Sequence, residues 1–257
     1  MVSGRKSCIL RAENISKVVE EKGKKFVIFD SVSFEIREGE IVSILGPTGS
    51  GKTSILNMVV GLEKPTAGEI FYRGEPLDSE KHIVPLIPQQ PISLPWLTVQ
   101  GNIEVVLEAK GIPLRQRIRT ALKYIDLMGL DSFEDTYPRE LTLAMRQRLS
   151  FARALSVEEE LIAMDDPFTT LDSLTAEDLR EEFLRLWLEK QLVVKSILLT
   201  TTNVEEAVYF SDRVYVLSRR PGRLLDIVDV NMPHPRDKDS KEFADIMDHI
   251  YSVLLSL

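Results

Sequence analysis

Two short segments of the sequence contain residues that could bind and cleave a phosphate-containing ligand. GPTGSGKT at 46–53 fits the phosphate-loop pattern, in which glycines turn backbone N–H groups toward phosphates and a lysine bridges the outer ones. AMDDPFTTLD at 163–172 places two adjacent carboxylates, Asp165 and Asp166, after an apolar run. Since a carboxylate in such a place can hold a metal ion or accept a proton from an attacking water, the role of each has to be decided.

The loop lies between a buried-strand pattern and a helical pattern, where a phosphate site needs it, because the helix N-terminus adds its positive dipole end. Lys52 is predicted to bridge the outer phosphates and Thr53 to bind Mg²⁺. A glycine-rich turn with an exposed lysine is the alternative, which this position disfavours. The predicted nucleotide-binding residues are Gly46, Pro47, Thr48, Gly49, Ser50, Gly51, Lys52, Thr53 and Ser54.

Three side chains are candidate ligands of that Mg²⁺: Thr53, Gln89 and Asp165. A carboxylate at the end of a neighbouring strand can hold the ion through its waters, which gives Asp165 a role beyond capping a strand. Gln89 follows the apolar run 83–87 and could reach the metal or the attacking water. Without further context, its position fits an ordinary loop glutamine equally well.

The elements that must position these residues alternate between strand and helix. Apolar runs typical of strands buried on both faces separate segments of helical periodicity, which predicts an α/β fold with a mostly parallel sheet. A long helical stretch at 98–156 interrupts the alternation. The strand-like runs lie at 41–45, 83–87, 161–164, 196–200 and 213–218.

Two further patterns concern packing. Val32, Phe34 and Ile36 alternate with polar residues and predict a half-buried strand. An apolar stripe at helical spacing is interpreted as core packing rather than as a partner-binding surface. It consists of Phe243, Ile246, Met247, Ile250, Tyr251, Leu254 and Leu255.

Composition excludes several classes of protein. With 257 residues and 44% hydrophobic residues the chain can bury a full core, and 32 basic against 40 acidic residues give a net charge of -8, which disfavours nucleic acid as a partner. Cys8 is the single cysteine, so no internal disulfide can form. The segment 1–17 turns polar too early for a signal peptide, and no apolar run is long enough to span a bilayer. A role at a membrane therefore requires a partner.

The order of the motifs GPTGSGKT, Gln89, ELTLAMRQRLSFARAL, AMDDPFTTLD and LLTTTNVEEA resembles the ATP-binding subunit of an ABC transporter over nearly the whole chain. The resemblance implies one domain, 1–257, with a P-loop NTPase core, an antiparallel β part and a helical subdomain inserted at about 91–155. A C-terminal tail and helix would occupy about 219–257. The implied ligands are ATP and Mg²⁺.

Within that superfamily, LPWLTV, SRRPGR and MPHPRDKDSKEF resemble the importers of nitrate, sulfonate, taurine or bicarbonate. The resemblance implies two ATP-binding subunits packed head to tail, with each ATP between the phosphate loop of one and the signature loop of the other. It also implies permease subunits near Trp96, a solute-binding protein as an indirect partner, and a peripheral location on the cytoplasmic face of the membrane.

The sequence departs from the family where ATP is hydrolysed. The family's glutamate after the metal aspartate is Asp166 here, shorter by about 1.5 Å, and a displacement of about 1 Å can cost roughly a hundredfold in rate. The family's switch histidine falls on Thr202, which is too short to replace an imidazole. Asp165 is therefore predicted to be the metal ligand and Asp166 an impaired base.

Two binding motifs depart as well. The signature LSGG appears as LTLA, so Thr142 keeps a hydroxyl while Leu143 and Ala144 replace glycines that let backbone approach phosphate. The adenine-stacking aromatic falls on Val19, with Phe26 as a substitute. These departures predict a weak, partner-dependent ATPase; the alternatives are a non-hydrolysing subunit that only closes the dimer, and an unimpaired enzyme that tolerates the substitutions.

Overall fold

The computed structural model describes residues 7–256, which divide into two compact units. The first unit combines residues up to Val84 with those from Lys195 onward, and the second is Pro85–Val194. The second unit contains the stretch predicted as an inserted helical subdomain, together with strands and a helix that flank it. Residues 1–6 of the segment compared with a signal peptide lie outside the described residues.

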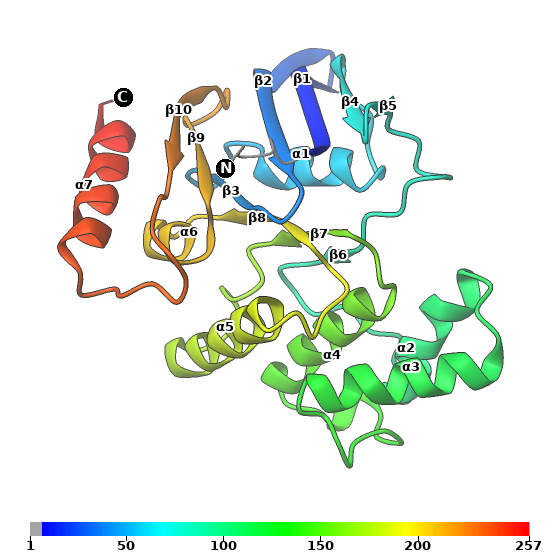
Figure 1. The fold of residues 1–257 in the computed structure, drawn as a ribbon. Coiled ribbons are helices and arrows are strands. Elements are labelled where there is room, and N and C mark those ends of the chain that lie inside the picture. The colour runs from blue at the N-terminus through cyan, green and yellow to red at the C-terminus, as the bar shows by residue number, and fades with distance from the viewer. Residues whose placement is uncertain (1–6, 257) are drawn as a thin grey trace. The chain divides into compact units, whose positions relative to one another are not determined.

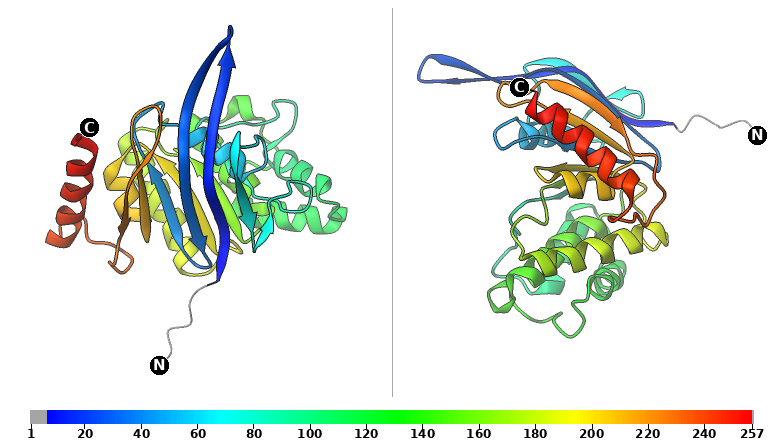
Figure 2. Two further views of the ribbon diagram at one scale, coloured as in Figure 1. Left: turned by 90° about the horizontal axis from the view of Figure 1, so that it is seen from above. Right: turned by 90° about the vertical axis from the view of Figure 1, so that its left-hand side faces the viewer.

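One sheet of the first unit is antiparallel, with the order β2-β1-β4-β5. Figure 2 shows its first two strands as a hairpin that extends far beyond the neighbouring strand. Burial at Val32, Phe34 and Ile36 confirms the half-buried strand predicted there. The strands are β1 (Cys8–Glu21), β2 (Lys24–Arg37), β4 (Ala67–Tyr72) and β5 (Glu75–Pro76).

The other strands of the first unit are arranged in the order β10-β9-β3-β8 (Figure 1). Strand β3 is parallel to both β8 and β9, and β10 is antiparallel to β9. Strands β3, β8 and β9 are buried along their whole length, as their mostly apolar runs predict. The strands are β3 (Ile41–Leu45), β8 (Ser196–Thr201), β9 (Arg213–Leu217) and β10 (Leu224–Asp229), and the helices are α1 (Lys52–Val59), α6 (Val204–Phe210) and α7 (Lys241–Leu255).

Helix α7 corrects part of the sequence interpretation. Its apolar stripe was interpreted as core packing, and Phe243 and Ile250 are indeed buried. Tyr251 and Leu255, however, are 45% and 81% exposed, because the helix packs against α6, β9 and β10 through one side only. The stripe is therefore partly a surface.

The second unit places a cluster of helices beside a short parallel strand pair. Helices α2, α3 and α4 pack against one another, and α4 also contacts β6. Strand β6 is shorter than the predicted run 83–87, because the flanking Pro85 and Pro88 have no N–H to donate to a ladder. The elements are β6 (Leu86–Ile87), α2 (Val99–Ala109), α3 (Leu114–Leu127), the 3₁₀ turn η1 (Pro138–Glu140), α4 (Leu143–Ser156), β7 (Leu161–Asp165) and α5 (Ser173–Leu188).

Among the helices of residues 7–256, none combines the length and the apolar character needed to cross a membrane.

Candidate functional site

The phosphate loop joins the carboxyl end of β3 to the N-terminus of α1. Gly51 precedes the helix with φ 97°, a left-handed conformation that favours glycine, and a Cβ there would lie 2.8 Å from the Phe29 ring. Gly49 has φ 85°, so the loop turns twice through conformations that side chains disfavour. The backbone N–H groups of the first turn of α1 have no acidic residue or side-chain cap beside them. This is the arrangement in which a helix N-terminus binds phosphate.

Two polar side chains of the loop, Ser50 and Lys52, are buried. The Lys52 ammonium donates to the carbonyl oxygens of Gly46 at 2.6 Å and Pro47 at 3.1 Å, so its charge lies over the loop. Ser50 Oγ is buried and has no hydrogen-bond partner among the described residues. Thr53 is exposed, on the first turn of α1. A buried hydroxyl that lacks a partner, beside a lysine, fits a ligand rich in acceptor oxygens such as a phosphate chain.

Thr202 lies at the same edge of the first unit as the loop. It follows β8, the parallel neighbour of β3, and the preceding Thr201 accepts a hydrogen bond from Gly46 N through its carbonyl oxygen at 3.3 Å. The Thr202 side chain is exposed, and Asn203 caps helix α6. The position assigned to the switch residue is thus beside the loop, although threonine lacks the reach of histidine.

Sequence reasoning missed Gly222. Its N–H donates to Ile28 O at 2.9 Å and its carbonyl accepts from Asp30 N at 2.9 Å, which fixes the β9–β10 turn against β2. A Cβ at this position would lie 2.1 Å from Ser50 O. Only glycine lets this turn approach the phosphate loop so closely. The nearby motif SRRPGR was used for subfamily resemblance alone, and nothing in its spacing reveals the contact.

The two candidates for the adenine contact face each other across the β1–β2 hairpin. Val19 is paired with Phe26, and the side chains are 40% and 39% exposed. The Arg220 guanidinium lies over the Phe26 ring, 5.6 Å from its centroid. Because opposite residues of an antiparallel pair share a face, both remain candidates for stacking on a base.

In the second unit, Gln89 and Asp165 belong to neighbouring strands. Strands β6 and β7 are parallel, with Ile87 paired to Met164, so the residues that follow them emerge at one edge. Gln89 is exposed and Asp165 is partly buried. The amide and carboxylate oxygens that they supply are the kind of ligand that Mg²⁺ prefers.

Asp166 is turned into its own loop. It is 7% exposed and has φ 43°, in the left-handed region. One of its carboxylate oxygens, Oδ1, accepts a hydrogen bond from the Thr169 hydroxyl at 2.5 Å. This acceptor oxygen is therefore engaged inside the loop.

Gln147 is a second residue that the sequence analysis did not select. It is fully buried on α4, and its Nε2 donates to Pro167 O at 2.8 Å and to Pro88 O at 3.4 Å. One amide thereby connects the segment after Asp166 to the segment before Gln89. Its place in MRQRLSFARAL looks like an ordinary polar helix position, so sequence alone gives no signal.

The signature positions form the N-terminus of α4. Thr142 is the N-cap, its hydroxyl accepting from Met145 N at 3.2 Å. Leu143 is 41% exposed, and Ala144 is intermediate. The side chain at 143 therefore projects at the surface that a glycine would leave open.

Comparison with known proteins identifies the family. Residues 29–169, more than half of the chain, match the family model described as ABC transporter. This chain belongs to the ABC transporter family. The cassette is 38% identical over 245 residues to an uncharacterized ABC transporter ATP-binding protein of Methanocaldococcus jannaschii, covering 95% of this chain and 91% of that one.

Other relatives of the cassette carry more specific names. It is 35% identical over 254 residues to the nitrate import ATP-binding protein NrtD of Synechocystis, covering 95% and 94% of the two chains. It is 30% identical over 234 residues to the aliphatic sulfonates import ATP-binding protein SsuB of Bacillus cereus, covering 91% of each.

Solved structures agree with this family assignment. The ABC cassette fold is shared with a dimeric ATP-binding cassette in a post-hydrolysis state bound to ADP and phosphate, at a TM-score of 0.77 and 27% identity, covering 88% of this chain and all of that one. The expected ABC ATPase core, with its mostly parallel strands, antiparallel part and helical region, is confirmed. As an ABC ATPase cassette, the protein has ATP as its family ligand, typically with Mg²⁺.

Proposed function

We propose that this cassette is the ATP-binding subunit of an ABC importer that moves a small solute of the nitrate, sulfonate, taurine or bicarbonate class. The support is its likeness to the nitrate and sulfonate import subunits over at least 91% of its length. Its partners would be permease subunits, near Trp96, and a second ATP-binding subunit. A solute-binding protein would act indirectly, and the cassette would lie peripherally on the cytoplasmic face of the membrane.

The residues that bind nucleotide are proposed as follows. The loop from Gly46 to Ser54 holds the phosphates, and Lys52 bridges the outer ones. Thr53, Gln89 and Asp165 supply oxygen ligands to Mg²⁺, which when bound neutralises charge on the phosphates. Val19 or Phe26 contacts the adenine.

Intrinsic hydrolysis is proposed to be weak. Asp166 is one methylene shorter than the family's glutamate and already accepts a hydrogen bond from Thr169. Thr202 stands where the family has a histidine whose imidazole contacts the outer phosphate of the same nucleotide. The exposed Leu143, between Thr142 and Ala144, would keep the backbone of this segment from approaching a partner's nucleotide closely.

A non-hydrolysing subunit that pairs with an active ATPase is the second candidate, favoured by the engaged Asp166 carboxylate. Both candidates require a permease and a second ATPase, so purification of the tagged cassette tests the assembly that they share. The tagged cassette should bring down a permease together with a second, motif-complete ATPase. If this chain, purified without the partner ATPase, binds Mg-ATP but releases no more phosphate than its Lys52→Ala variant, its own site does not turn over and the second candidate holds.

The observation that carries nucleotide binding is the phosphate loop with Lys52 and the unpartnered Ser50 hydroxyl. Lys52→Ala should weaken the affinity for Mg-ATP by about tenfold to a hundredfold, because a charge-assisted contact to the phosphates is lost. Fluorescence titration with a nucleotide analogue measures this. Lys64→Ala, at an exposed lysine outside the loop, is the control. Equal affinity in wild type and Lys52→Ala contradicts the assignment.

A further inference from the structure

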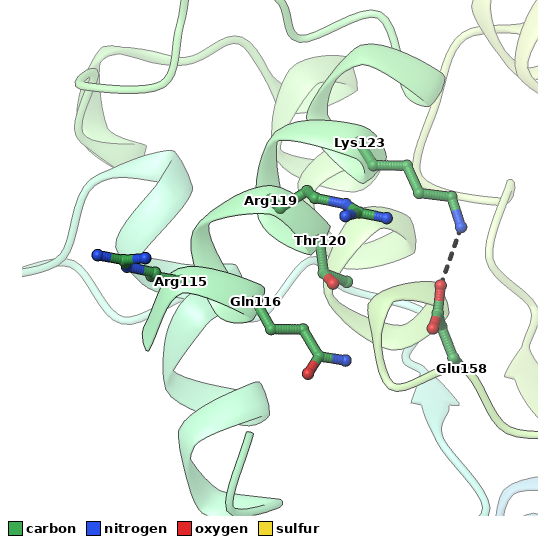
Figure 3. Close-up of a pocket in the computed structure, with 6 residues that line it drawn as sticks. All are labelled: Arg115, Gln116, Arg119, Thr120, Lys123 and Glu158. Carbon is green, nitrogen blue, oxygen red and sulfur yellow. Dashed lines mark hydrogen bonds and ion pairs between the residues drawn. The ribbon is translucent and has the colours of Figure 1, made fainter. Parts of the chain in front are cut away.

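Helix α3 presents a basic pocket that no part of the nucleotide chemistry uses. The pocket has a volume of about 580 Å³ and lies within the second unit. Arg115, Arg119 and Lys123 follow one another at intervals of four residues and so share one face of α3. Figure 3 shows its lining, which consists of Arg115, Gln116, Arg119, Thr120, Lys123 and Glu158.

Only one of these cations is neutralised. Lys123 Nζ lies 2.9 Å from Glu158 Oε1, and the same carboxylate accepts a hydrogen bond from the Tyr124 hydroxyl at 3.1 Å. Within residues 7–256, no ion pair joins Arg115 or Arg119 to a carboxylate. Arg117, on another face of the helix, does form one, with Glu108 at 2.7 Å. Two guanidinium groups thus remain without a counter-charge in a chain whose net charge is -8.

The two arginines repel each other in this arrangement. Like charges four residues apart on a helix repel each other, and both arginines are exposed. Asp126 is exposed one turn beyond Lys123 but does not line the pocket. A ligand with negative charge would relieve the repulsion between Arg115 and Arg119.

The remaining lining groups select the kind of anion. Figure 3 shows Gln116, Arg119, Thr120 and Lys123 extending toward the side of α3 on which Glu158 lies, whereas Arg115 extends away at the rim. The guanidinium groups, the Gln116 amide and the Thr120 hydroxyl all donate hydrogen bonds. Guanidinium forks match the paired oxygens of phosphate in geometry as well as in charge.

We propose that this pocket binds a phosphate group carrying two negative charges, through Arg119 with the neighbouring Gln116 and Thr120, while Arg115 adds positive charge at the rim. The group could belong to a soluble phosphorylated molecule or to the headgroup of an anionic lipid. An exposed apolar stripe, Leu114, Ile118 and Leu122, runs beside the arginines and is 56%, 37% and 42% exposed. A lipid would contact both the arginines and this apolar stripe, whereas a soluble phosphorylated molecule would contact the arginines alone. The proposal is independent of the importer assignment.

The test for a soluble source uses pyrophosphate and the full chain carrying Lys52→Ala, which reduces binding at the phosphate loop. Adding Arg115→Ala and Arg119→Ala should weaken pyrophosphate binding in calorimetry by about tenfold or more. Arg115→Lys with Arg119→Lys should lose less, since the charge remains. Lys24→Ala with Lys25→Ala, which removes the same charge from exposed positions of β2, should change nothing. Circular dichroism confirms that each variant is folded.

The test for a lipid source uses vesicles of phosphatidylcholine with and without phosphatidic acid. The proposal, with a lipid as the source, is supported if the protein sediments only with vesicles that contain phosphatidic acid and if removal of both arginines abolishes this sedimentation. Sedimentation that needs Leu114, Ile118 and Leu122 but is indifferent to the arginines overturns it. Binding of neither probe, or binding of both probes that is equal with and without the arginines, overturns it as well.

Discussion

The proposal of weakened hydrolysis depends most on the carboxylate of Asp166. Its side chain is short, its backbone is left-handed at φ 43°, and its Oδ1 is engaged by Thr169. The left-handed region tolerates aspartate better than most residues, because its short side chain can hydrogen-bond locally. On the proposal of weakened hydrolysis, the Thr169 hydrogen bond would hold the carboxylate within its own loop instead of leaving it to an attacking water.

The prediction at this residue is that Asp166→Asn changes little. A working general base contributes about a hundredfold or more, whereas removal of an idle carboxylate should slow phosphate release by less than about threefold. Steady-state phosphate assays at saturating Mg-ATP measure the difference. Asp165→Asn is the comparison, because loss of a proposed metal ligand should weaken Mg²⁺-dependent binding. A hundredfold loss in Asp166→Asn shows that the aspartate is an effective base.

Some site residues could be predicted from sequence and others could not, for physical reasons. The loop around Lys52 follows a contiguous pattern whose geometry is local, so reading the sequence locates it. Gly222 and Gln147 act on residues 172 and 20 positions away, at Ser50 and Pro167, and such contacts exist only once the chain is folded. The conformation of Asp166 also depends on its folded loop.

At the scale of elements, predictability follows burial. Strands β3, β8 and β9 are buried along their whole length and appear in the sequence as mostly apolar runs. Strands β1 and β2 pair over a long, exposed and irregular hairpin with register shifts and polar tips, so alternation identifies only the segment near Phe34. β10 carries polar residues at an edge and was not predicted.

Helix α4 holds the two loops that follow β6 and β7 through Gln147. Gln147→Leu keeps the volume but leaves Pro88 O and Pro167 O without this donor, which should cost about 1–3 kcal/mol of stability. The midpoint of urea denaturation measures the loss. Gln116→Leu, an exposed glutamine on α3, should shift it by less than about 0.5 kcal/mol. Equal shifts of the denaturation midpoint for the two substitutions would show that the Gln147 hydrogen bonds do not contribute to stability.

At the scale of the molecule, a buried histidine makes stability depend on pH. His234 is 9% exposed, and neither ring nitrogen has a hydrogen-bond partner among the described residues. Burial, with Arg236 nearby, lowers the pKa of His234 to about 4, while Asp212 opposes the shift. The unfolded chain, with a histidine pKa of 6.5, therefore takes up a proton before the folded one does. Stability from this group is complete above pH 6.5 and is lost as pH falls toward 4.

The free energy of unfolding should accordingly decrease by about 2 kcal/mol between pH 7 and 5 on account of His234. His234→Leu removes this group from the titration, so the variant should show a flatter profile over that range. Parallel slopes for wild type and His234→Leu would show that the imidazole is protonated equally in both states.

On the proposal of weakened hydrolysis, the identity of the second ATP-binding subunit determines how the motif departures combine in each composite site. In a homodimer each composite site contains Asp166, Thr202 and the LTLA signature together, so neither should turn over well. With a motif-complete partner, the site on this chain's phosphate loop lacks base and switch, while the other lacks only the signature glycines. The partner's phosphate-loop site should therefore carry most of the hydrolysis.

The most direct test is steady-state phosphate release by the homodimer at saturating Mg-ATP, before and after repair of its motifs. Asp166→Glu with Thr202→His should be faster than wild type by about tenfold or more, and faster than either change alone, because base and phosphate contact act on one transition state. Adding Leu143→Gly and Ala144→Gly should raise the rate again. A wild-type homodimer already as fast as its repaired versions would contradict a weakened ATPase.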